Sequence, residues 1–250
     1  MSMPPSLTSG VKMQPKVIGR MRQIHQYDLR AFKGRVFFTT DLHGCYDLLH
    51  EKLREAGFDT SKDLLFVGGD WTDRGPDSRY VLDYLDEPWI ISIQANHEDI
   101  YIGAYEEGFN DTAAYTRCLM DNGGGWTTNL DKTHAKAIYD TFKELPVAIE
   151  LLLLTETVGI IHAEVPYNSW DRFKEMLETE YRWDGKNKAQ WGRDKYRDKD
   201  QAVITGIDRV FVGHTPTDST EVEVLGNVWY CDLGAFYYDK IAFVEIKGNE

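Results

Sequence analysis

The chain has 250 residues, of which 42% are hydrophobic and 13% aromatic, and its formal net charge is −13. This apolar content is ample for a packed core and argues against disorder, and the length suits one large domain. The negative charge disfavours nucleic acid as the main ligand, because an acidic surface repels the phosphate backbone. Small phosphorylated substrates stay possible, since bound divalent cations can reverse the field inside a cleft.

The cysteines and the N-terminal segment indicate where the protein works. Cys45, Cys118 and Cys231 are far apart and form no CxxC motif, which indicates a reducing compartment without disulfides or a thiolate zinc site. No run approaches the roughly 20 apolar residues that cross a bilayer, and residues 1–10 lack the apolar centre of a signal peptide. We therefore expect a cytoplasmic protein with no membrane partner, with a flexible tail at residues 1–20 and a single domain at 21–250.

The first part of the domain alternates between strands and helices. Short apolar runs rich in β-branched and aromatic residues predict buried strands at 35–39, 64–67 and 89–93. Helical patterns lie between them at 46–56 and 78–85, with Asp77 as a candidate N-cap of the second. This β-α-β-α-β order predicts a parallel segment with right-handed crossovers.

The rest of the chain contains a helical insertion followed by more strands. Helices are predicted at 111–119 and 132–145, separated by the breaker at 122–125, so the insertion covers about 110–145. Strands at 148–154 and 158–161 form a hairpin, and the polar stretch near 184–200 indicates a loop or short helix. Further strands are expected at 209–212, 221–225, 228–231 and 241–246. The whole predicts an α/β fold, a β-sandwich of mixed sheets flanked by α-helices.

Residues that can bind metals follow five of the predicted strands. In chain order they are Asp41 and His43, then Asp70 and Asp73, then Asn96 and His97, then His162, and last His214. In open α/β folds ligands bind at the carboxyl ends of strands, so we expect these residues at the same end of a sheet. A single aspartate there is usually a turn residue and a single histidine usually packs, but five coincidences are an improbable accident.

The residue types fit a site for two cations. Carboxylate, imidazole and amide oxygen are ligands of Mn²⁺, Fe or Zn²⁺ and need no thiolate. A carboxylate can bridge two cations, and metals about 3.5–4 Å apart can share one hydroxide nucleophile. The sequence therefore predicts two-metal phosphoester chemistry.

Three consecutive motifs carry a family resemblance. Asp41-Leu42-His43-Gly44, Gly69-Asp70 with Asp73-Arg74-Gly75, and Asn96-His97-Glu98 resemble the phosphoprotein phosphatase family of metallophosphoesterases. The resemblance is to its bacterial and phage branch, typified by the lambda phage serine/threonine phosphatase. It runs from about Gly34 to the C-terminus. Further matching motifs lie at 122–126, 144–146, 161–166, 191–193 and 211–216.

The resemblance implies a role for each matching residue. Asp41 and His43 would bind a first metal, Asp70 would bridge, and Asn96, His162 and His214 would complete a second site, with two Mn²⁺ ions (or Fe or Zn²⁺). His97 would be the general acid, Asp73 its orienting carboxylate, and Arg74 and Arg193 the arginines that grip the phosphate. The implied reaction is direct hydrolysis of a phosphomonoester: hydroxide attacks phosphorus and His97 protonates the leaving alkoxide.

Three residues depart from the family pattern, although no ligand is missing. Thr40 stands where glycine usually precedes the first ligand, and Gln94-Ala95 stand where Arg-Gly normally precede Asn-His-Glu. Ala95 adds a Cβ where a positive φ would favour glycine, and Gln94 removes a charge near the cleft. We expect these changes to affect efficiency, metal preference or selectivity.

Several functions stay open at this point. A serine/threonine protein phosphatase that acts on phosphorylated proteins or peptides is the first choice, with tyrosine as a further target. A dinucleoside polyphosphate hydrolase is the runner-up, and a catalytically inactive phosphopeptide-binding module is a third reading. A nuclease is disfavoured by the charge. The aromatic residues Trp71, Trp126 and Tyr167 lie beside site motifs and could line either kind of substrate site or pack as an ordinary rim.

Overall fold

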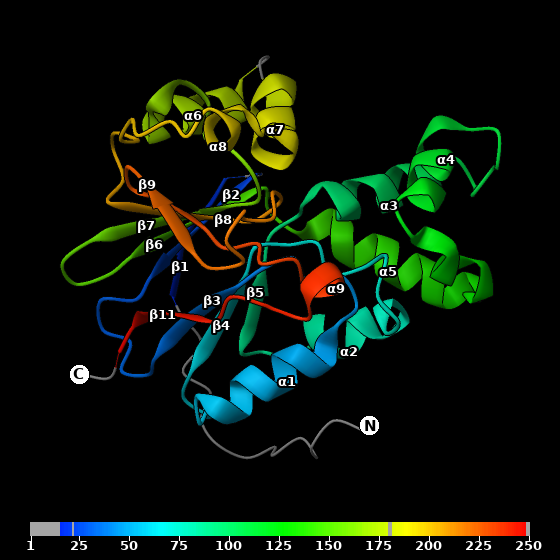
Figure 1. The fold of residues 1–250 in the computed structure, drawn as a ribbon, viewed down its shortest axis with the longest axis horizontal. Helices are drawn as coiled ribbons and strands as arrows, with labels where there is room; N and C mark the ends of the chain where they lie inside the picture. Colours follow the sequence, from blue (N-terminus) through cyan, green and yellow to red (C-terminus); the bar gives the residue numbers. More distant parts are fainter. Residues whose placement is uncertain (1–15, 22, 180–181, 249–250) are drawn as a thin grey trace.

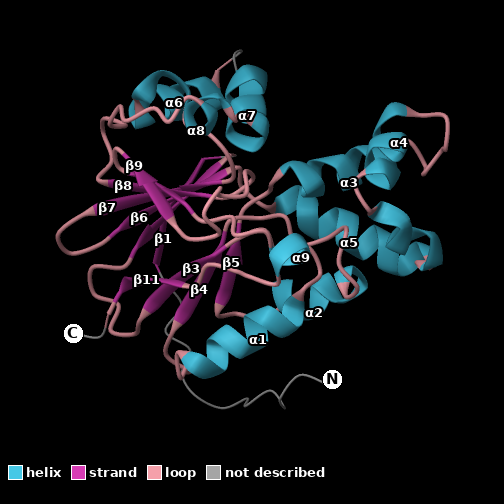
Figure 2. Cartoon of the chain, viewed as in Figure 1, coloured by secondary structure: helices cyan, strands magenta, loops and turns pink. Residues whose placement is uncertain are grey.

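The computed structural model describes residues 16–21, 23–179 and 182–248. In this part of the chain two mixed β-sheets face each other, and helices cover their outer sides (Figure 1). Figure 2 shows the strands gathered in the middle, with helices above, below and to the right of them. The predicted α/β sandwich with helices outside is confirmed.

The smaller sheet has four strands in the order β11-β3-β4-β5. Strands β3 (Val36–Thr39), β4 (Leu64–Val67) and β5 (Ile90–Ser92) are parallel, as predicted, and β11 (Val244–Lys247) runs antiparallel to β3. Strands β3 and β4 are apolar and buried along their whole length, as central parallel strands are. The helices α1 (Tyr46–Glu55) and α2 (Val81–Leu85) join these strands. A 3₁₀ turn, η1 (Ser78–Tyr80), precedes α2, and the Asp77 side chain does not cap it.

The larger sheet has seven strands in the order β1-β2-β6-β7-β8-β10-β9. Its members are β1 (Lys16–Met21), β2 (Ile24–Asp28), β6 (Ala148–Leu152), β7 (Thr157–Ile161), β8 (Arg209–Val212), β9 (Glu223–Leu225) and β10 (Val228–Tyr230). Strands β6 and β7 form the predicted hairpin, and β7, β8 and β10 are parallel. The tail predicted up to residue 20 is wrong for residues 16–20, because they belong to β1, which pairs with β2. Residues 1–15 lie outside the described part.

Two groups of helices complete the fold. The predicted insertion comprises α4 (Ala114–Asp121), η2 (Gly124–Asn129) and α5 (Lys132–Glu144), and it packs beside α3 (Asn96–Glu106), which the sequence did not reveal. The outer side of the seven-stranded sheet carries α6 (Trp170–Glu178), α7 (Arg182–Trp191) and α8 (Asp194–Arg197), after the turn η3 (Pro166–Asn168) (Figure 1). A four-residue helix, α9 (Ala235–Tyr238), follows β10. In the described residues no helix is long and apolar enough to cross a membrane.

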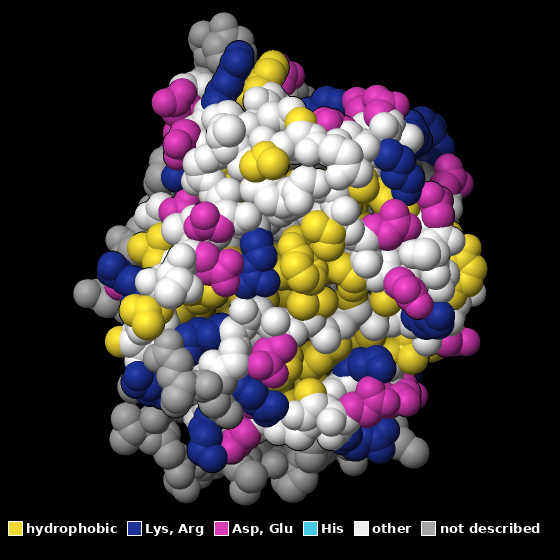
Figure 3. Space-filling model, turned by 60° about the vertical axis from the view of Figure 1, so that its left-hand side comes forward, with side chains coloured by type: hydrophobic (Ala, Val, Ile, Leu, Met, Phe, Trp, Pro, Cys, Tyr) yellow, Lys and Arg dark blue, Asp and Glu magenta, His cyan; other side chains and the backbone are white. Residues whose placement is uncertain are grey.

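Apolar clusters separate the layers. One lies between the two sheets, where the rings of Phe38 in β3 and Phe211 in β8 are 5.1 Å apart. A second joins the larger sheet to α6 and α7, and a third joins the smaller sheet to α1, α2 and the insertion. On the face shown in Figure 3, apolar side chains gather at the centre and charged side chains of both signs surround them. The sheets are thus held by a continuous apolar interior that fixes where their strand ends meet.

Truncation of the ring between the sheets tests this interior. Phe211 is fully buried, so Phe211→Ala should lower the free energy of unfolding by about 3–5 kcal/mol through lost burial and a cavity. Urea denaturation followed by circular dichroism measures the change. The matched control Val224→Ala alters a side chain that is 46% exposed and should change stability by less than about 0.5 kcal/mol. A loss below about 1 kcal/mol for Phe211→Ala would contradict the described packing.

Candidate metal centre

The candidate site lies where strand ends of both sheets meet. Asp41 and Asp70 follow β3 and β4 of the smaller sheet, whereas His162 and His214 follow β7 and β8 of the larger one. The expectation that all these residues share one sheet is therefore wrong. Hydrogen bonds join the two groups: the His214 amide donates to Asp41 Oδ1 over 3.0 Å, and His162 Nδ1 lies 2.8 Å from the Gly68 carbonyl oxygen.

The backbone at this junction is strained. Left-handed φ values, rare for residues other than glycine, occur at six of the predicted site residues: Asp41, His43, Asp70, Asp73, Arg74 and His214. Such conformations cost on the order of 1–3 kcal/mol each and cluster at functional sites. The strain sets these turns apart from ordinary surface turns.

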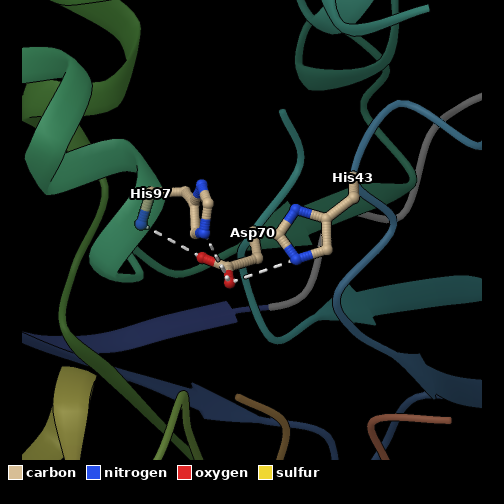
Figure 4. Close-up of side chains that lie close together, drawn as sticks. All are labelled: His43, Asp70 and His97. Atoms are coloured by element: carbon tan, nitrogen blue, oxygen red, sulfur yellow. Dashed lines mark hydrogen bonds and ion pairs between the residues drawn. The ribbon is translucent and has the colours of Figure 1, made fainter. Parts of the chain in front are cut away.

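Asp70 is the centre of the cluster. Its Oδ2 atom lies 3.6 Å from His43 Nε2, 3.9 Å from His97 Nε2 and 3.3 Å from His162 Nε2. Its Oδ1 accepts a hydrogen bond from the His97 amide over 3.1 Å (Figure 4). Two groups of potential ligands share this carboxylate. The first group is His43, Asp70 and His97, and the second group is Asp70, His162 and His214. One carboxylate that serves two groups is the arrangement a bridging ligand requires.

Unpaired polar atoms show that the second group fits a cation. Asn96 Oδ1, His162 Nε2 and His214 Nε2 are buried and have no hydrogen-bond partner among the described residues. Buried polar atoms without a partner are rare and call for an explanation. All three atoms can coordinate a divalent cation, His162 Nε2 once it has lost its proton, and all three belong to residues predicted as second-metal ligands.

The Asp41 carboxylate is held by hydrogen bonds from its neighbours. It accepts hydrogen bonds from Thr40 Oγ1 over 2.6 Å and from the His214 amide, and it lies in neither group of candidate ligands. His97, predicted as the general acid, lies with His43 and Asp70 in the first group. Thr40, which departs from the family pattern, thus acts on the orientation of the first predicted ligand.

The protonation of the imidazoles reflects the buried charge. Burial lowers the pKa of His43 to about 3 and that of His214 to about 2, so both rings are neutral, the form that binds metal. Burial also opposes the charged form of His162, but the carboxylates of Asp70 and Asp41 outweigh it and raise the pKa of His162 to about 9. The carboxylates therefore require positive charge at this place, which a proton supplies here and a divalent cation could supply instead.

His97 belongs to a hydrogen-bonded chain. Its Nδ1 lies 2.6 Å from Asp73 Oδ2, and Trp126 Nε1 donates to Asp73 Oδ1 over 2.6 Å. With Nδ1–H donated to this carboxylate, Nε2 faces the centre. Burial lowers the pKa of His97, but the carboxylates of Asp70 and Asp73 raise it by more. The pKa of His97 therefore lies above its usual value. The sequence left Trp126 open between lining a substrate site and packing at its rim, and did not reveal this hydrogen bond, whose partners are 53 residues apart.

Two arginines reach the centre from different elements. Arg74 Nη1 lies 2.5 Å from His43 Nε2, and Arg74 Nη2 lies 3.1 Å from His97 Nε2. Arg193 stands between α7 and α8, so the stretch predicted as a loop or short helix contains two short helices. Burial and the charge of Arg197 lower the pKa of Arg193, while the carboxylates of Asp232, Asp41 and Asp70 act in the opposite sense.

Asp232 is a residue of the site that the prediction missed. It is buried, and burial together with the Asp41 carboxylate holds its pKa well above its usual value. It follows β10, which is parallel to β8, so the rule that polar residues follow strand ends would have found it.

Glu98 and its neighbours fix the turn that carries Asp70. The buried Glu98 carboxylate accepts hydrogen bonds from the amides of Asp70, Trp71 and Ala95 over 2.9–3.0 Å.

Ala95 has a φ of −102°, so the expected need for a positive φ at this position is wrong, and Gly69 beside it has the positive φ instead. Gln94 is buried and donates to the Phe142 carbonyl oxygen over 2.9 Å, so it joins the insertion to the site.

The remaining aromatic candidates differ in exposure. Trp71 is fully buried and donates from Nε1 to Ser92 Oγ over 2.7 Å, so it is part of the core. Tyr167 is 60% exposed and its ring lies 3.9 Å from the Arg172 guanidinium.

Comparisons with known proteins agree with this geometry. Residues 34–218 match the family model for calcineurin-like phosphoesterases. Serine/threonine-protein phosphatase 1 of Salmonella typhimurium is 32% identical over 85% of this chain and 92% of its own. The symmetrical bis(5'-nucleosyl)-tetraphosphatase of Buchnera aphidicola is 36% identical over 30% of this chain and 28% of its own. A crystallised cold-active protein tyrosine phosphatase shares the fold, with a TM-score of 0.58, 15% identity, and coverage of 90% of this chain and 77% of that chain.

Cation binding should stabilise the fold. Because the candidate ligands come from both sheets, Mn²⁺ at 100 times its dissociation constant should add about 2.7 kcal/mol and raise Tm by several degrees over chelated protein. Differential scanning calorimetry measures the shift. His162→Ala should remove most of it, whereas His50→Ala, on α1 and outside the cluster, should retain it. A wild-type Tm that is the same with Mn²⁺ and with chelator would count against the centre.

Proposed function

Because this chain belongs to the calcineurin-like phosphoesterase family, we propose that it is a metal-dependent protein phosphatase that hydrolyses phosphoserine and phosphothreonine. The observation that carries the proposal is the pair of ligand groups sharing Asp70, beside the His97–Asp73 pair. The relative named as a serine/threonine-protein phosphatase matches most of both chains, which supports a protein substrate. The family match over residues 34–218 supports one catalytic domain.

We assign the predicted ligands to two divalent cations, with Mn²⁺ as the proposed metal. Asp70 would bridge, His43 and Asp41 would hold one ion, and Asn96, His162 and His214 would hold the other, where three buried ligand atoms have no other partner. When bound, the cations would lower the pKa of a water molecule and neutralise charge on the phosphate. None of these ligands is a thiolate, and carboxylate, imidazole and amide oxygen suit Mn²⁺.

The side chains around the cations would bind the phosphate and deliver a proton. Arg74 and Arg193 present planar guanidinium groups to the phosphate oxygens. Arg74 is 3.1 Å from His97 Nε2, so a phosphate held by Arg74 lies within reach of that ring. Asp73 accepts from Nδ1 and keeps Nε2 directed at the leaving oxygen, and Trp126 holds the other oxygen of Asp73. His97 therefore acts as the general acid.

A dinucleoside polyphosphate hydrolase is the second candidate. The match to a tetraphosphatase favours it, but that match covers less than a third of either chain, whereas the protein phosphatase match extends over both. Because the protein phosphatase match is the longer one, we prefer a protein phosphatase to a dinucleoside polyphosphate hydrolase.

Comparison of two substrates tests the proposed function. Protein loaded with Mn²⁺ should release phosphate from a phosphoserine peptide with a higher kcat/KM than it shows for diadenosine tetraphosphate. Chelation should abolish turnover and Mn²⁺ should restore it. A preference for the dinucleotide would replace the proposal by the second candidate. Absence of metal-restored turnover, even with an aryl phosphate, would leave a phosphopeptide-binding module.

Replacement of the acid tests the role of His97. His97→Asn should reduce kcat on a phosphoserine peptide by on the order of 10²–10⁴, the usual span of general acid catalysis. The loss should be smaller on an aryl phosphate, because a phenolate leaves more easily without protonation. Steady-state kinetics on both substrates measures the difference. Equal losses on the two substrates would show that His97 does not protonate the leaving group.

A further inference from the structure

We propose that Arg197, one helical turn from the phosphate-binding Arg193, forms a subsite for a second anionic group on the substrate, a carboxylate or phosphate two residues from the phosphorylated side chain. This inference rests on the proposed function and specifies its substrate class. Three observations single out these two arginines: they form no ion pair with any carboxylate that the structure describes, their segment contacts the metal centre, and they lie one helical turn apart.

The lysines of this region all have acidic partners. In the described residues 184–199, Lys186, Lys188, Lys195 and Lys199 each lie within 4.0 Å of at least one carboxylate. Neither Arg193 nor Arg197 forms a hydrogen bond or ion pair with its guanidinium in the described part of the chain, although acidic residues outnumber basic ones 41 to 28. Asp194, the acidic residue nearest in sequence to Arg193, is already paired with Lys188. The hydrogen bond from Lys188 and, less strongly, the charge of Arg197 lower the pKa of Asp194, but no hydrogen bond or ion pair among the described residues commits either guanidinium, so both can contact a ligand.

The segment that carries both arginines is anchored to the metal centre. The Trp191 ring lies 6.0 Å from the ring of His214. The amide of Lys195 donates to the buried carboxylate of Glu164 over 3.0 Å, two residues beyond His162. The carboxylates of Asp232, Asp41 and Asp70 act electrostatically on Arg193, and bound cations would neutralise the last two, which leaves the charge of Arg193 for an anion. The pair therefore stands at the rim of the proposed phosphate site.

The spacing of the two arginines selects the kind of ligand. The Arg197 amide donates to the Arg193 carbonyl oxygen over 3.0 Å, so the residues are one helical turn apart, about 5–6 Å between Cβ atoms. In an extended peptide, side chains on the same face are two residues and about 6.6 Å apart, while adjacent side chains point to opposite faces. With the phosphate held by Arg193, Arg197 is placed to meet an anion at the second residue along the peptide rather than at the first.

Binding of phosphonate peptides tests the subsite without turnover. Three fluorescent peptides carry a non-hydrolysable phosphonate analogue of phosphoserine, flanked by Glu at both second positions, by Glu at both first positions, or by Ala at all four. With Mn²⁺-loaded protein, anisotropy should show about fivefold tighter binding for Glu at the second positions than at the first, as for an exposed ion pair. Arg197→Gln should reduce this ratio below about twofold, and Arg197→Lys should retain part of it.

A neighbouring charge provides the control. Lys199→Gln removes the same charge two residues away, from a lysine paired with Asp218 and Glu223, and should keep the wild-type ratio. If Arg197→Gln leaves the ratio unchanged, or if Lys199→Gln lowers it equally, the subsite is wrong although the protein phosphatase function can stand. If wild-type protein neither binds these peptides nor hydrolyses a phosphoserine peptide, the proposed function fails, and the subsite fails with it.

Discussion

The buried carboxylate of Asp70 is the constraint on which the rest of the site depends. A charge this deep is tolerated only when opposite charges and hydrogen bonds surround it, and here three imidazoles and the His97 amide do so. Glu98 fixes the turn beneath it by accepting the amides of Asp70 and Trp71. The left-handed turns and the raised pKa of His162 follow from the need to converge on one buried anion, whereas burial keeps His43 neutral against the pull of the same carboxylate.

The sequence predicted the parts of the fold that local pattern determines. Strand β4 begins and ends where the prediction placed it, because its four residues are apolar and polar or flexible residues flank them. Strand β1 was missed because its pattern is mixed and its place in the sheet depends on pairing with β2, which in turn pairs with β6 far along the chain. The assignment of each strand to one of the two sheets could not be predicted either, since the strand-end rule gives direction but not pairing partners.

Residue identities in the site were easier to predict than their contacts. The strand-end rule brought together Asp70, His162 and His214 correctly, because parallel strands deliver their ends to one place. It did not reveal that Asp41 turns toward Thr40 and the His214 amide, or that Trp126 holds Asp73. These orientations are set by neighbours distant in sequence, and a local pattern carries no information about them.

The origin of the ligands in both sheets has a consequence for how the chain folds. The hydrogen bond from the His214 amide to Asp41 closes a loop of 173 residues, and the contact of His162 with Gly68 closes one of 94. Contacts of such long range are entropically costly and form late, after local hairpins and helices. The centre therefore assembles only when the two halves of the sandwich have docked. A ribosome-bound chain that still lacks β8 and His214 has an incomplete set of candidate ligands, so the second group could bind a cation only after this strand has been synthesised.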